Sequence, residues 1–91
     1  MTKFTSGQEI LIPAEVVDGP FPAERLVSFE TSRGPLSGFV AEAVVVKREG
    51  KDYLRARIQE VTSDTLLVWV NGSFFNTNGL ARLPIEAGLA A

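Results

Sequence analysis

The segment from Ser37 to Val70 constrains the fold most, because it reads as three consecutive β-strands joined by two short polar turns. The predicted strands are SGFVAEAVVVK, YLRARIQEV and TLLVWV, and the connections are REGKD and TSD. Connections this short join strands as antiparallel hairpins. The middle of the chain is therefore predicted to be an antiparallel meander.

Alternation of apolar and polar residues predicts which side of each strand is buried. In the second strand of the meander, Leu54, Ala56 and Ile58 share one face, and the arginines between them share the other. Applied along the chain, the same pattern predicts a core that contains Ile10, Ile12, Val44, Leu54, Ala56, Ile58, Leu66 and Val68.

Two more strands are expected before the meander, at residues 7–17 and 26–31, with the sequence DGPFP as a turn after the first. The strand over residues 37–47 is unusually long and has Gly38 near its start. A strand of this kind is expected to bend sharply, so that it serves two sheets.

The tail carries two strong turn signals, Asn71-Gly72 and Asn78-Gly79, since Asn-Gly tolerates the positive φ angles of tight hairpins. Residues 73–75 and 80–84 are therefore expected to be short strands. A helical turn should begin at Pro84 and end at Gly88. No segment has an apolar period of 3.6 residues over ten or more positions.

Short strands leave many unpaired edges, and closure of the sheet removes them. We therefore predict an all-β fold for residues 1–91: one small domain, in which five or six of these strands form an antiparallel barrel or rolled sheet. The order of GQEILIPAEV, the loop around DGPFP, SDTLLVWV and GLARLP resembles that of small SH3-like barrels, such as those with KOW motifs. The strand LVSFET departs from the simplest version of that barrel.

The chain lacks the residue types that most catalytic and metal-binding sites use. The 91 residues include no cysteine and no histidine, which excludes disulfides, thiolate nucleophiles and histidine bases or ligands. Ser37 lacks the spacing of a nucleophile elbow. Glu9 and Glu15 lie about 20 Å apart along one strand, too far to act as a pair. We predict no cofactor, no metal and no catalytic residue; an active site formed between subunits stays open as an alternative.

Net charge and hydropathy limit the classes of partner that are expected for this chain. The net charge is −2 and the pI about 5.0, which disfavours non-specific nucleic-acid binding. The longest apolar runs have five residues, against about 20 for a membrane span, and the start MTKFTSGQE lacks the apolar core of a secretory signal. A cytoplasmic location without a membrane partner is expected, and Asn71-Gly72-Ser73 is then a turn rather than a glycosylation site.

Two surface features could bind ligands. Phe21 lies between two prolines, where it could anchor a partner or instead plug one end of the barrel. Arg55 and Arg57 share a strand face about 6.6 Å apart and could hold a phosphate or carboxylate. Alternatively, they form a solvated face paired with Glu42 or Glu60.

A third feature is the segment that contains Phe74, Phe75, Asn76 and Asn78. Adjacent strand residues face opposite ways, so one of the two phenylalanines should point outward. With amides beside it, this ring could anchor a partner or a second copy of the chain. We therefore predict a non-catalytic interaction module or small subunit that binds a protein partner or itself. The alternative is a nucleic-acid- or ribosome-associated small barrel that uses Arg55 and Arg57.

Overall fold

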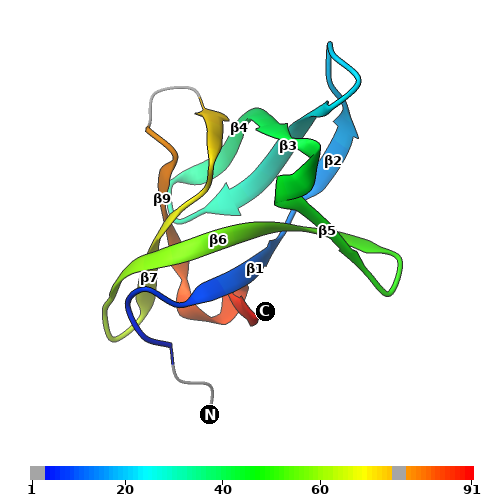
Figure 1. Ribbon diagram of the computed structural model, residues 1–91. Helices are drawn as coiled ribbons and strands as arrows, with labels where there is room; N and C mark the ends of the chain where they lie inside the picture. Colours follow the sequence, from blue (N-terminus) through cyan, green and yellow to red (C-terminus); the bar gives the residue numbers. More distant parts are fainter. Residues whose placement is uncertain (1–3, 75–77) are drawn as a thin grey trace.

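The computed structural model describes residues 4–74 and 78–91, which form ten β-strands and two short 3-10 helices (Figure 1). In chain order, these elements are β1 (Glu9–Pro13), β2 (Glu15–Asp18), β3 (Glu24–Thr31), β4 (Gly34–Ala41), η1 (Glu42–Val44), β5 (Val45–Arg48), β6 (Lys51–Val61), β7 (Thr65–Trp69), β8 (Gly72–Phe74), β9 (Leu80–Pro84), η2 (Ile85–Ala87) and β10 (Leu89–Ala90). In the described part of the chain, no helix is long and apolar enough to cross a membrane.

The strands form two antiparallel sheets, which confirms the predicted all-β fold. The six-stranded sheet has the order β10-β1-β6-β7-β9, with β5 also paired to β6, and the four-stranded sheet has the order β2-β3-β4-β8. Strand β6 is the centre of the first sheet, since it pairs with β1 along one side and with β5 and β7 along the other. The hairpins of the meander are present as predicted.

Two of the additional strands arise where longer predicted strands break and change sheets, and a third, β10, follows η2 and pairs with β1. The strand expected over residues 7–17 is divided at Ala14, with β1 in one sheet and β2 in the other. The strand expected over residues 37–47 also serves both sheets, but its bend lies at Glu42–Val44, where η1 separates β4 from β5. The expectation that Gly38 marks the bend is wrong, because Gly38 lies inside β4.

Both sheets pack their inner faces onto one hydrophobic core. Val27, Phe29 and Val40 enter it from the four-stranded sheet, and Leu83 enters it from β9. Val44 is only half-buried, because it lies in η1 rather than in a strand. The other predicted core residues are buried as expected: Ile10, Ile12, Leu54, Ala56, Ile58, Leu66 and Val68.

Backbone hydrogen bonds join the two sheets at separate places. The Ala14 amide donates to the Asp52 carbonyl at 3.2 Å, and the Ser32 amide donates to the Arg82 carbonyl at 2.8 Å. Backbone groups at these strand ends are thereby paired instead of being left as free edges. The result is a rolled arrangement with one enclosed core.

The tail forms the expected short strands, but the prediction of a tight hairpin at Asn71-Gly72 is wrong, because Gly72 is already the first residue of β8, which pairs with β4 rather than with β7. Strand β8 begins one residue before the predicted segment, whose last residue, Phe75, lies outside the described residues. Gly79 has a φ of 87°, and its carbonyl accepts a hydrogen bond from the Val70 amide at 2.9 Å. Directly after Pro84, η2 forms the expected helical turn.

Gly38 has a packing role in β4. It lies opposite Phe74 in the β4–β8 ladder, and a Cβ atom at this position would overlap the Ser73 carbonyl oxygen and the Phe74 ring. Glycine inside a strand often marks such a close approach. The absence of a side chain at residue 38 therefore lets the Phe74 ring lie over β4.

We expect Gly38→Ala to lower the free energy of unfolding by about 1–3 kcal/mol, because the new methyl group must push β8 away. Urea denaturation measures the change. Gly88→Ala is the control, since its nearest neighbours are the flexible ends of Leu66 and Ile10 at 3.0 and 3.1 Å. Equal effects of the two substitutions would contradict this role for Gly38.

Ile58 tests the predicted strand face. Ile58→Ala should destabilise the protein by about 2–5 kcal/mol through lost burial and an unfilled cavity. This is a large part of the roughly 5–15 kcal/mol typical of a small domain. The exposed neighbour Gln59 provides the control Gln59→Ala, which should move the denaturation midpoint little. A midpoint that is unchanged in Ile58→Ala would contradict the enclosed position of Ile58.

Candidate protein-binding face

The outer face of the four-stranded sheet carries an apolar row across three neighbouring strands. Val17 on β2 lies directly opposite Leu26 on β3, and Leu26 lies directly opposite Phe39 on β4. Directly opposite residues of antiparallel strands project from the same face. The alternate residues Val27 and Val40 point into the core, so the row points away from it. We call Val17, Leu26 and Phe39 the apolar row.

The apolar row is only partly covered. Val17 is 57% exposed, and Leu26 and Phe39 are half-buried. The solvated face of an antiparallel sheet normally carries polar residues. An apolar row across the middle of such a face is the kind of surface that proteins use to contact partners.

Phe21 extends this surface at the end of the β2–β3 hairpin. Its side chain is 67% exposed, so the interpretation of Phe21 as a plug for the barrel end is wrong. The turn is held by hydrogen bonds from the Glu24 amide to the Phe21 carbonyl at 3.0 Å and from the Gly19 amide to the Glu24 carbonyl at 3.1 Å. The Phe21 ring is therefore presented outward on a hydrogen-bonded turn.

A shallow hollow connects Phe21 with the apolar row. Its lining includes Phe21 from the turn, Phe39 from β4, and residues 71–73 at the start of β8. The fold thus brings the β2–β3 turn and the start of β8 to one hollow. Ser73 lies directly opposite Phe39, so its hydroxyl adds a polar group at the end of the row.

The charge around the row is acidic. Glu15 on β2 and both Glu24 and Glu30 on β3 alternate with inward-facing residues, and therefore occupy the outer face. Among the described strands of this sheet, no lysine or arginine occupies an outer-face position. The arrangement is an apolar centre with carboxylates on both sides, which favours a partner with an apolar centre and a basic rim.

Phe74 is the inward-facing member of the phenylalanine pair. It is 8% exposed and packs edge-to-face on Phe29, with ring centroids 5.8 Å apart. Phe75 and Asn76 lie outside the described residues, so the outward position remains a prediction. Asn78 is exposed.

Arg55 and Arg57 lie on the other sheet and do not join this face. The Nη1 atom of Arg55 is 3.6 Å from the Glu9 carboxylate, and Arg57 donates to the Gly7 carbonyl at 2.7 Å. The expected acidic partners are engaged elsewhere. Glu42 pairs with Arg25 at 2.6 Å.

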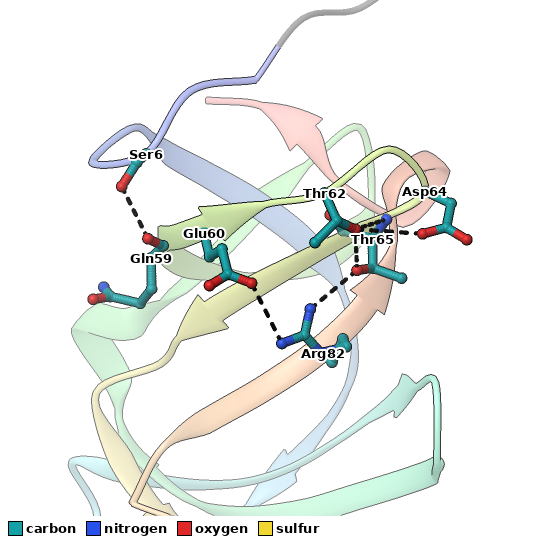
Figure 2. Close-up of polar contacts among 7 residues, drawn as sticks. All are labelled: Ser6, Gln59, Glu60, Thr62, Asp64, Thr65 and Arg82. Atoms are coloured by element: carbon teal, nitrogen blue, oxygen red, sulfur yellow. Dashed lines mark hydrogen bonds and ion pairs between the residues drawn. The ribbon is translucent and has the colours of Figure 1, made fainter.

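Glu60 pairs with Arg82 at 3.7 Å, as Figure 2 shows. Arg82 also donates to the Thr65 hydroxyl at 3.1 Å, and Thr65 shares a hydrogen bond with Thr62 at 2.6 Å. A register shift between Ile58 and Glu60 places Glu60 opposite Leu67. The β-bulge thus aims this carboxylate at Arg82, a contact that strand alternation alone does not predict.

The apolar row was missed in the sequence because each of its members looks ordinary alone. The available signal is alternation within LVSFET, which puts Leu26 and Val27 on opposite faces. The alignment of Leu26 with Val17 and Phe39 depends on the register of three strands. Register across β2, β3 and β4 therefore creates the row.

Within the described residues, no group of three or more acidic side chains is placed to hold a metal ion. Comparison of the chain with family models, with curated proteins and with solved structures gives no match. The function must therefore be argued from the geometry of the surfaces.

Substitutions of Phe21 and Phe74 test which of these rings lies at the surface and which lies in the core. Phe21→Ala should change the free energy of unfolding by less than about 0.5 kcal/mol, as is usual for exposed positions. Phe74→Ala should cost about 3–5 kcal/mol, because it empties a packed site beside Phe29. Thermal and urea denaturation of the monomeric protein measure both. A strongly destabilised Phe21→Ala variant would show that this ring is part of the core.

Proposed function

We propose that the chain is a non-catalytic interaction module that binds a protein through the outer face of its four-stranded sheet. The observation that carries the proposal is the exposed Phe21 beside the apolar row. Aromatic side chains near the centre of a contact, surrounded by polar residues, supply much of the binding energy of protein interfaces. Here Phe21 and Phe39 line one hollow.

The support comes from shape and charge together. Single exposed apolar residues are common on any protein. In this sheet, however, Val17, Leu26 and Phe39 are aligned by direct strand pairing. The flanking carboxylates Glu15 and Glu24 would disfavour acidic partners and attract basic ones. The binding partner is therefore proposed to be a protein surface with an apolar centre and basic edges.

A nucleic-acid-binding function for Arg55 and Arg57 has one observation in its favour. Arg57 lies directly opposite Trp69, which is 40% exposed, so cationic and aromatic groups share one face. Such combinations bind single-stranded nucleic acid by phosphate contact and base stacking. Against it, the Arg55 guanidinium already faces the Glu9 carboxylate, and the net charge is −2. We rank this function second.

Site-specific photo-crosslinking tests the proposed function. The variant Phe21→p-benzoylphenylalanine, produced in the source cells, should form covalent adducts of defined mass on irradiation. The same replacement at the exposed residue Glu86, which lies in η2, should not form them.

The adducts should also disappear when Val17→Ser is combined with the photoreactive residue, because the substitution removes one end of the apolar row. Adducts that are identical at residues 21 and 86 would contradict the proposal. So would adducts that do not respond to Val17→Ser in a protein with an unchanged melting temperature.

A further inference from the structure

The outer face of the six-stranded sheet carries a second row of directly paired residues. Glu9 on β1 lies opposite Arg57 on β6, Arg57 opposite Trp69 on β7, and Trp69 opposite Leu80 on β9. Trp69 and Leu80 are 40% and 42% exposed. This sheet, like the other, has exposed apolar groups on its outer face, here on β7 and on the edge strand β9.

The charge of this second face is opposite to that of the first. The cationic side chains at its outer positions are Arg48, Lys51, Arg55, Arg57 and Arg82. Its outer carboxylates are Glu9 and Glu60, which pair with Arg55 and Arg82. We call this the basic face, and the outer face of the four-stranded sheet the acidic face.

A further cation lies at the edge of the basic face. Arg33, in the β3–β4 turn, lines a hollow together with Leu67, Leu80 and Arg82. The apolar groups Leu67 and Leu80 are thus bordered by two guanidinium groups. This hollow has an apolar centre and a basic rim. It is therefore complementary to the acidic face, which has an apolar centre and carboxylates around it.

The large exposed apolar residues of the described chain all belong to these two faces. Val17 and Phe21 are on or beside the acidic face, and Trp69, Leu80 and Leu89 are on the basic face. Because both sheets bury their inner sides in one core, both faces are directed away from that core. One molecule therefore presents two complementary surfaces, one on each sheet.

We propose that the occupant of the acidic face is the basic face of a second copy of this chain. The inference rests on the proposed function and names its partner. In the contact, Phe21 and the apolar row meet the region of Trp69 and Leu80, and Glu15 and Glu24 meet arginines of the other copy. Matching opposite potentials over apolar centres is the arrangement that fixes partner choice at protein interfaces.

This contact is head-to-tail, so it differs from a two-fold dimer. After two copies join, one acidic face and one basic face remain free at the ends. Head-to-tail contacts continue into rings or open chains, whereas two-fold contacts stop at two copies. The average mass should therefore rise beyond that of a dimer as the protein concentration rises.

The first test measures how the mass of the unmodified protein in solution depends on salt concentration. Raising the ionic strength from about 0.1 M to about 1 M shortens the screening length from about 10 Å to about 3 Å. Sedimentation velocity should show assemblies of the 9.9 kDa chain at the lower salt and their loss at the higher salt. A mass that stays at the monomer under both conditions, or that stops at the dimer, overturns the proposal.

Exchanging the charges tests which faces meet. The triple variant Arg55→Glu/Arg57→Glu/Arg82→Glu makes both faces acidic, and Glu15→Lys/Glu24→Lys makes both faces basic. Each variant alone should associate about tenfold or more weakly than the parent, because like charges then oppose each other. An equimolar mixture should recover association, since every contact between the two variants is again between opposite charges.

Recovery in the mixture distinguishes head-to-tail contact from the alternatives. If either variant alone keeps the parent's association, or if two folded variants fail to associate when mixed, the proposal is overturned. Melting temperatures of the variants establish that they are folded; if either is not, the salt measurement on the parent decides.

The remaining outcomes separate this inference from the proposed function. Photo-adducts at residue 21 with the mass of a different protein, together with a monomeric parent, leave the interaction module standing and overturn self-association. Absence of adducts and a monomeric mass overturn both. Salt-sensitive binding of a single-stranded oligonucleotide, lost in Arg55→Glu/Arg57→Glu/Arg82→Glu, would instead assign the basic face to nucleic acid.

Discussion

The rest of the structure depends on one shared hydrophobic core between two antiparallel sheets. Because successive strand residues point to opposite sides, burying Val27 and Val40 on the inside directs Leu26 and Phe39 to the outside. A chain of this length encloses one modest core, and the described strands contribute their inner sides to it. On β3 and β4 the outer face therefore follows from the core, because the residues that alternate with the buried ones lie at the surface.

The chain reaches both sheets by breaking its longer strands. Ala14 and η1 are two of the points where it passes from one sheet to the other, and it passes again between β7 and β8. Hydrogen bonds such as that from the Ala14 amide to the Asp52 carbonyl keep the sheets together there. The same construction gives the molecule two separate outer faces. The proposed function rests on the distribution of charge and apolar groups over these faces.

The net charge of the chain does not show that the two faces carry opposite charges. Eleven acidic and nine basic residues give a net charge of −2, which suggests only a mildly acidic protein. In the folded chain, Glu15, Glu24 and Glu30 share one outer face, whereas all three arginines of β6 and β9 share the other. Net charge describes solubility and non-specific binding; the arrangement in space decides which surfaces can meet.

The sequence by itself determined the antiparallel meander, the helical turn after Pro84 and most of the core, because strand alternation and turn chemistry are local. It placed Leu54, Ala56 and Ile58 inside and their arginine neighbours outside, as observed. Tertiary structure decided what local patterns do not encode. Register aligned Val17, Leu26 and Phe39, packing required Gly38 to admit the Phe74 ring, and the hairpin turn left Phe21 exposed instead of buried. Each of these depends on which strands become neighbours, a property of contacts between residues far apart in the chain.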